Sequence, residues 1–278
     1  MKTGTRNTLI FALWLICIGT VLVVIALFAG ADMGNALDGM ERILDGEKTE
    51  DFTEEVNMNT KGWDLVPVGS SFGATQVAKL DLELAAAQTV IVSGNDFSVK
   101  ASGDGCSVKQ DGDTLKISSR SKGLGFFKTI GRAKKIEITV PQEINLDLLD
   151  ITVGAGSLRS DARLVCKKGK AEIGMGECKL LNFHSSEGFD VECGMGSVQI
   201  TGRMEGELKI ECGMGEVQMN LEGNPADYAY AAEVGMGSVK INDTEISGVG
   251  GNSSSPYSAR NNLKVECGLG AVNIKIGR

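Results

Sequence analysis

The sequence predicts an all-β fold, a single β-solenoid with coils of about 20 residues, preceded by one transmembrane helix. Three observations predict this fold. A Gly-x-Gly tripeptide flanked by residues that alternate between apolar and polar recurs six times in the second half of the 278-residue chain. A stretch of 23 residues near the N-terminus carries no charge.

The uncharged stretch runs from Leu9 to Ala31. As a helix it is about 34 Å long, which is enough to cross a hydrocarbon core of about 30 Å. Lys2 and Arg6 precede it, so residues 1–8 are expected in the cytoplasm and the rest of the chain outside the cell membrane. A cleaved signal peptide is the alternative, and the length of the stretch favours the single-pass anchor.

The net charge of −8 is concentrated behind this span, because residues 32–55 alone carry a net charge of −7. A run of this kind is typical of a solvated spacer. We therefore assign residues 32–60 to an acidic juxtamembrane linker and residues 61–278 to the exported β-solenoid domain. The negative balance argues against a nucleic-acid partner.

The Gly-x-Gly tripeptides begin at positions that are 20, 20, 19, 22 and 33 residues apart. Each is flanked by short alternating segments with the period of a half-buried strand. Glycine at the turn is expected because it adopts positive φ without a Cβ clash. The six tripeptides begin at Gly154, Gly174, Gly194, Gly213, Gly235 and Gly268.

The alternation predicts two columns of inward side chains with an outward column between them. The inward columns are Val153, Ile173, Cys193, Cys212, Val234, Cys267 and Ile151, Ala171, Val191, Ile210, Ala232, Val265. The outward column is Thr152, Glu172, Glu192, Glu211, Glu233 and Glu266. Stacked carboxylates repel one another far more in a dry interior than in water, so we expect this column to be solvated.

Upstream segments without the tripeptide are expected to form less regular coils of the same domain. These are Val77–Leu84, Thr89–Ser93, Phe97–Ala101, Thr114–Ser118 and Lys135–Val140. The long final spacing contains 247–262, which we expect to be an exposed loop. The last coil has no recognisable cap, so its Val272, Ile274 and Ile276 edge is expected to pair with a second copy or another partner.

The segment 135–141 (KIEITVP), followed by Leu149-Asp150-Ile151 and serial strand–glycine–strand units, resembles the bacterial β-strand repeat family named "putative adhesin". This family is related to the toastrack domains of envelope-stress proteins. The resemblance covers Val77 to Arg278 and implies an exported or membrane-anchored protein. It carries over no catalytic residue.

One segment combines basic and aromatic residues. From Thr114 to Ile136 there are seven basic residues and no acidic one. This pattern is typical of contacts with anionic lipid or a phosphate-bearing wall polymer. The alternative is a long loop whose phenylalanines pack on the end of the core. The candidate binding residues are Lys122, Phe126, Phe127, Lys128 and Arg132.

The cysteines outside the span are interpreted as buried thiols, because free cysteine behaves as a small apolar residue. A Cys193–Cys212 bridge between neighbouring coils is the alternative. Cu(I) at Cys193 and Met195, or Ca²⁺ on the glutamate column, is disfavoured against a core ladder and a solvated strand face. No metal or cofactor is expected.

Enzymatic activity is not expected, because the single histidine, His184, leaves histidine-based metal sites and nucleophilic triads incomplete. His184 is expected in a turn. Polysaccharide cleavage would need carboxylates clustered in a groove, and regular spacing already explains those present. The sequence favours a binding or sensing module of the cell envelope; the alternative is a structural adhesin or scaffold that acts through the solenoid surface.

Overall fold

The computed structural model of the chain describes residues 65–68, 77–102, 106–119 and 134–277, all within the compact unit Thr60–Arg278. The expected N-terminus 1–8, span 9–31 and linker 32–60 lie outside the described residues. Within the described ranges, no helix is both long and apolar enough to cross a membrane.

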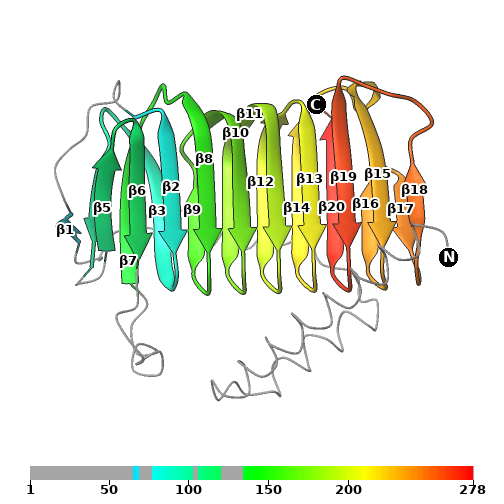
Figure 1. Ribbon diagram of the computed structural model, residues 1–278, viewed down its shortest axis with the longest axis horizontal. Helices are drawn as coiled ribbons and strands as arrows, with labels where there is room; N and C mark the ends of the chain where they lie inside the picture. The colour runs from blue at the N-terminus through cyan, green and yellow to red at the C-terminus, as the bar shows by residue number, and fades with distance from the viewer. Residues whose placement is uncertain (1–64, 69–76, 103–105, 120–133, 278) are drawn as a thin grey trace, which may run out of the picture. The chain divides into compact units, whose positions relative to one another are not determined.

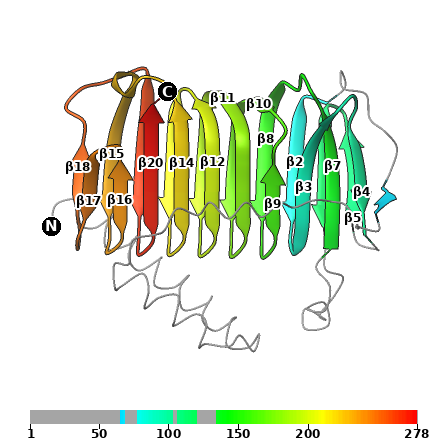
Figure 2. The same ribbon diagram turned by 180° about the vertical axis from the view of Figure 1, so that it is seen from behind.

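The described residues form an all-β structure, a curled mixed sheet of twenty strands (Figures 1 and 2). The sheet curls into two opposed rows of strands, here called the first and the second face, which pack against each other. Along each face the neighbouring strands are parallel. In spatial order, the first face consists of β6 (Thr114–Ser119), β2 (Lys79–Leu84), β8 (Leu146–Val153), β10 (Leu164–Ile173), β11 (Glu177–Cys193), β13 (Glu207–Cys212), β19 (Asn261–Cys267) and β15 (Tyr228–Val234).

The second face begins with β7 (Lys134–Pro141) and also includes the first half of the long strand β11. Its further strands, in spatial order, are β3 (Ala87–Gly94), β9 (Ser157–Ser160), β12 (Ser197–Met204), β14 (Glu216–Glu222), β20 (Ala271–Gly277) and β16 (Ser238–Ile241), with β11 between β9 and β12. One strand from each face makes one layer of the stack, and in six of the layers a Gly-x-Gly turn joins the two strands.

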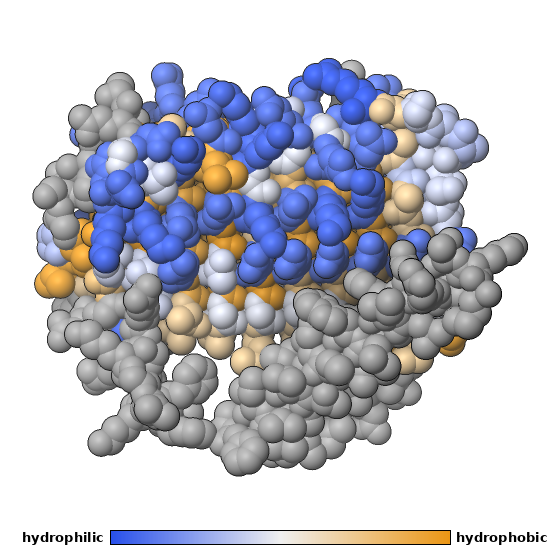
Figure 3. Space-filling view, viewed as in Figure 1, coloured by the Kyte–Doolittle hydropathy of each residue, from blue (hydrophilic) through white to orange (hydrophobic). Residues whose placement is uncertain are grey.

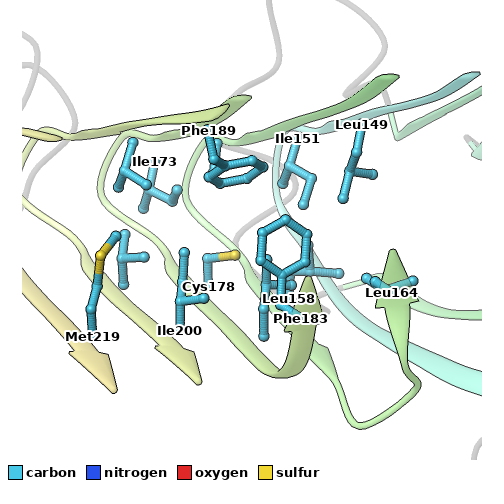
Figure 4. Close-up of a cluster of buried hydrophobic side chains, with 14 of the residues drawn as sticks. Leu149, Ile151, Leu158, Leu164, Ile173, Cys178, Phe183, Phe189, Ile200 and Met219 are labelled. Atoms are coloured by element: carbon cyan, nitrogen blue, oxygen red, sulfur yellow. The ribbon is translucent and has the colours of Figure 1, made fainter. Parts of the chain in front are cut away.

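The expected inward columns are confirmed, since every member of both is at most 3% exposed. Side chains from the two faces point toward each other and fill the space between them (Figure 4). Phe183 and Phe189, both on β11, meet edge to face with ring centroids 4.7 Å apart. The glutamate column lies on the outer side of the first face, as expected.

The order of the layers differs from the order of the chain at both ends. The last layer, β19 with β20, lies between the layer of β13 and β14 and the layer of β15 and β16. The first layer, β2 with β3, likewise lies inside the layer of β6 and β7. The prediction of a free edge at Val272, Ile274 and Ile276 is therefore wrong, because β20 pairs with β14 on one side and with β16 on the other.

Short antiparallel strands close both ends of the stack. At one end β4 (Ser98–Ala101) pairs with β7, β5 (Cys106–Asp111) pairs with β6, and β1 (Val66–Pro67) pairs with β4. At the other end β17 (Thr244–Ser247) pairs with β16, and β18 (Asn252–Ser254) pairs with β15. The segment 247–262, expected as a loop, thus contributes a strand to this closure. Short, polar edge strands limit edge-to-edge association.

The glycines of the turns are needed for a different reason from the one expected. Positive φ occurs at glycines such as Gly202 and Gly206, but not in the six tripeptides. A Cβ on Gly196 would lie 2.1 Å from the carbonyl oxygen of Gly176 in the neighbouring layer. The turns require glycine because parallel backbones approach closely there, about one strand spacing apart.

Candidate functional site

The predicted binding residues Lys122, Phe126, Phe127, Lys128 and Arg132 lie outside the described residues. The strands on either side still show where their segment attaches. Ser119, the end of β6, pairs with Leu84, and Lys134, the start of β7, pairs with Ala87. Leu84 and Ala87 flank a turn between the two faces, so the segment 120–133 joins the faces at the edge that carries the Gly-x-Gly turns.

The middle residues of these turns form a continuous row, here called the tip row. Each backbone N–H donates to a carbonyl oxygen of the neighbouring layer; Met195 donates to Gly174 and Met214 to Gly194, at 2.8 and 2.7 Å. The N–H of Gly250 donates to Gly235 at 2.8 Å, so the turn of Val249 extends the row. In spatial order the tip row is Ala155, Met175, Met195, Met214, Leu269, Met236 and Val249.

Most of the tip row is solvent-exposed although every member is apolar, and Met195 and Met214 are half-buried. The exposed fractions are 50% for Met175, 63% for Met236, 47% for Leu269 and 88% for Val249. In Figure 3 the visible part of the lower edge of the strands is pale to tan, whereas rows of blue cross the face above it. This edge carries a line of exposed apolar side chains separated by glycine.

The opposite edge, where the chain returns from the second face to the first, is charged. Exposed side chains of both signs occur along it: Glu143, Asp161, Arg163, Glu187, Asp227, Asp243 and Arg260. The two edges of the same stack therefore differ in polarity.

The outward carboxylates of the first face are interleaved with lysines. Lys170 Nζ lies 2.5 Å from Glu172 and 2.8 Å from Glu192, and these contacts raise the pKa of Lys170. Burial, and then the neighbouring carboxylates Glu211 and Glu233, raise the pKa of Glu266. In the part of the chain that the structure describes, no three His, Cys, Asp or Glu side chains are arranged to hold a metal ion. The arrangement is that of a solvated, charge-balanced strand face.

Three of the cysteines stack directly on one another in the interior. Cys193 pairs with Cys212, and Cys212 pairs with Cys267. Each thiol donates to the second glycine of its own turn, at 3.2, 3.1 and 3.1 Å. The adjacent sulfur atoms and burial raise the pKa of Cys212. All six cysteines in the described ranges are free thiols, which agrees with the interpretation as a core ladder.

His184 lies on β11 between Val165 of β10 and Arg203 of β12, so its expected position in a turn is wrong. Its Nε2 atom is buried and has no hydrogen-bond partner in the described structure. One surface hollow of about 220 Å³ lies over Asp81, Asp150 and Lys170, and another of about 290 Å³ lies beside Tyr230 and Tyr257.

Comparison with known proteins gives structural neighbours only. No family model and no curated protein matches the chain. A "putative cell adhesion protein" from Clostridium sporogenes is similar in structure, with 19% identity, a TM-score of 0.44, and coverage of 76% of this chain and 99% of its own. A "putative adhesin" from Bacteroides fragilis follows with 14% identity, a TM-score of 0.30, and coverage of 76% and 97%.

A third neighbour is a "putative lipid binding protein" from Parabacteroides distasonis, with 14% identity, a TM-score of 0.31, and coverage of 75% and 96%. The first two names match the family that the sequence resembles. Because the identities and TM-scores are low, the function proposed below rests on the chain's own residues.

Sequence reasoning missed the tip row as a surface feature. The signal was present, because the middle residue of each of the six repeated tripeptides is Ala, Met or Leu. Gly248-Val249-Gly250, inside the supposed loop, also has an apolar middle residue, although both of its glycines have positive φ and no close neighbour.

Proposed function

We propose that the chain is a non-enzymatic module of the bacterial cell envelope that binds an envelope component through its surface. In this proposal residues 9–31 are a single-pass anchor, residues 1–8 are cytoplasmic and residues 61–278 are exported. The uncharged 23-residue stretch and the acidic residues that follow it support the anchor. The chain's single histidine supports a non-enzymatic role, because it leaves histidine-based triads incomplete.

The proposal includes the class of fold, a β-solenoid with coils of about 20 residues. Parallel pairing supports it, because Glu172, Glu192 and Glu211 are direct neighbours although they are about one repeat apart in the chain. The closed ends are compatible with the capping that repeat architectures require.

The segment 120–133 is the proposed contact with an anionic partner, through Lys122, Phe126, Phe127, Lys128 and Arg132. The observation that carries this is its charge, with four basic residues and no acidic one. Phosphate is the group recognised, and it occurs both in lipid headgroups and in wall polymers. The alternative role, a structural adhesin or scaffold, requires no such contact.

The test places the full chain in nanodiscs of neutral phosphatidylcholine, so that its apolar stretch is already occupied. Capture of phosphatidylglycerol vesicles or of soluble polyglycerol phosphate then identifies the source of the phosphate. We expect capture to fall steeply as salt shortens the Debye length from about 10 Å at 0.1 M to about 3 Å at 1 M.

The variant K122A/K128A/R132A is expected to lose capture. Its control, K109A/K240A/K275A, removes three exposed lysines elsewhere and changes the net charge equally. Equal capture by the two variants, or capture of neither probe by the unmodified chain, would contradict the anionic partner and favour the scaffold.

A further inference from the structure

Exposed turns in proteins usually carry Gly, Asn, Asp, Ser or Pro, because these residues suit the backbone of turns and the surrounding water. The tip row instead has an apolar residue in each of seven successive turns, from Ala155 to Val249. The core does not account for them, since Met236 is 63% and Val249 is 88% exposed. A repeated exposed apolar residue indicates a surface that becomes buried against a binding partner or a membrane.

The backbone N–H groups at this edge already donate to carbonyl oxygens of the protein. Transfer of the edge from water into an apolar medium therefore does not break their hydrogen bonds. The N–H of Met175 donates to Gly154, and the N–H of Leu269 donates to Gly213, at 2.8 and 2.7 Å. The first glycine of a turn does the same, as Gly194 donates to Ile173 at 2.8 Å. Placing hydrogen-bonded backbone in an apolar medium avoids the penalty that unpaired peptide groups pay there.

Charged side chains do not oppose such a transfer. Some of the carboxylates nearest to the tips are paired on the two faces, whereas Glu216, Glu233 and Glu266 have no ion pair within the described structure. Glu177 lies 2.7 Å from Lys179, and Glu172 lies 2.5 Å from Lys170. These pairs would lie at the level of water and lipid headgroups when the tips point into a bilayer.

We propose that the tip row is a membrane-seating edge, which inserts its methionine, leucine and valine side chains into the interfacial region of a lipid bilayer. The proposal rests on the anchor proposed above. Thirty-three residues, 32–64, separate the proposed span from the first described residue. A domain tethered to the membrane meets lipid at a high effective concentration, so a weak insertion is sufficient to orient it.

A second copy of the chain fits the tip row less well than lipid does. Seven tips at about 4.8 Å spacing make a line about 29 Å long and one residue wide. A stable protein interface buries at least about 1,200 Å² in total, which one such line does not supply. Flexible methionines suit an adaptable surface, and the basic segment 120–133 joins the strands at this same edge.

The experiment measures the depth of single tryptophans in vesicles. The full chain carries Trp14→Phe and Trp63→Phe, which remove its native tryptophans, together with Met195→Trp in the tip row. A matched chain carries Ala226→Trp on the exposed opposite edge instead. Both are reconstituted in phosphatidylcholine vesicles with or without brominated acyl chains, and vesicle flotation confirms that the chain is attached.

We expect bromine to reduce the emission of the Met195→Trp chain about twofold, because interfacial side chains sit about 5–10 Å deep at the headgroup–acyl boundary. The Ala226→Trp chain should show no reduction. Replacing Met175, Met214, Met236 and Leu269 by asparagine in the Met195→Trp chain should abolish the reduction while the far-ultraviolet circular dichroism is kept. High salt should leave the reduction unchanged, because apolar contact drives it.

A floating chain whose Met195→Trp emission is insensitive to bromine overturns the seating edge and leaves the anchor intact. A blue shift without bromine quenching also overturns it, since protein rather than lipid then covers the tips. A chain that does not float overturns both proposals. If quenching is unchanged in K122A/K128A/R132A, insertion of the tip row does not depend on the basic segment.

Discussion

The backbone N–H of Met236 donates to the carbonyl oxygen of Gly268 at 2.7 Å. The Gly-x-Gly turn that is last in the sequence, at Gly268, therefore lies closer to the centre of the stack than the turn at Gly235, which precedes it in the chain. The layer of β15 and β16, together with β17 and β18, covers the C-terminal layer. The layer of β6 and β7, with β4 and β5, covers the first layer in the same way. Because short antiparallel strands form both outer ends, each apolar layer has a neighbour on either side.

The internal position of the C-terminal layer predicts that charge in β20 destabilises the fold. Ile274 is fully buried, and β20 lies between β14 and β16. An unpaired lysine there should lower the free energy of unfolding by about 4 kcal/mol, and Ile274→Ala by about 3 kcal/mol. Urea unfolding of the purified chain measures both. The exposed neighbour Lys275→Ala should change the value by less than about 0.5 kcal/mol.

An Ile274→Lys chain that unfolds like the unmodified chain but has a lower mass in light scattering would contradict this prediction. That result would mean that β20 is a free edge used for association.

The strands and their facing could be predicted because both follow from local rules. A period of two assigns each side chain to a face, and the tripeptides fix where the faces meet. The order of the layers could not be predicted in this way. Three strands have nearly the same sequence, namely Val191-Glu192-Cys193, Ile210-Glu211-Cys212 and Val265-Glu266-Cys267. Local pairing rules therefore allow any two of them to be neighbours.

A signal for the order exists only across distant segments. Placing Cys267 beside Cys212 makes the cysteine column continuous, whereas chain order would insert Val234 between them. For the candidate site, sequence supplied the charge of residues 120–133 but not the edge at which they attach. That position depends on the pairing of Ser119 with Leu84, which is a tertiary fact.

The close approach of the turns predicts a large cost for a single methyl group. A Cβ on Gly196 would meet both the carbonyl oxygen of Gly176 and, at 2.8 Å, the side chain of Ile173. Gly196→Ala should lower the free energy of unfolding by about 3 kcal/mol, because neither backbone nor packed core can move away easily.

Gly277→Ala is the control, since a Cβ there has no heavy atom within 4 Å, and its effect should be below about 0.5 kcal/mol. Equal unfolding midpoints for the two variants would show that the layers are farther apart than described.

Burial of the thiols predicts that they react slowly. Burial raises the pKa of Cys178, and likewise of Cys166, to about 12. At pH 8 the reactive thiolate is then about one part in 10⁴, so alkylation by iodoacetamide should be about 10³-fold slower than in urea. Cys106, which is only partly buried, should be labelled first.

Peptide mass spectrometry reports the order of labelling. Faster reaction at Cys178 than at Cys106 would contradict the buried ladder. A mass loss of about two daltons that joins the Cys193 and Cys212 peptides would instead support the bridge between layers, the alternative for this column.

The last prediction concerns the glutamate column and pH. Burial and the like charges of Glu211 and Glu233 raise the pKa of Glu266, so the folded protein holds its proton to higher pH than the unfolded chain does. Stability then falls as pH rises through this window, and the full cost of the charge is present above it. Glu207 is the opposite case, because its ion pair with Lys264 lowers its pKa and contributes stability at neutral pH.

Glu266→Gln should therefore raise the free energy of unfolding at pH 7 by about 0.5 kcal/mol and have little effect near pH 3, where the side chain is protonated in both states. Glu207→Gln should lower stability at pH 7. This loss should shrink as pH falls below the pKa of an unfolded glutamate and disappear only below the lower pKa of Glu207 in the folded protein. Urea titrations of the three chains at pH 3 and pH 7 give both comparisons. A Glu266→Gln chain that is less stable at pH 7 would show that Lys209, which favours the charged form, outweighs burial and the neighbouring carboxylates.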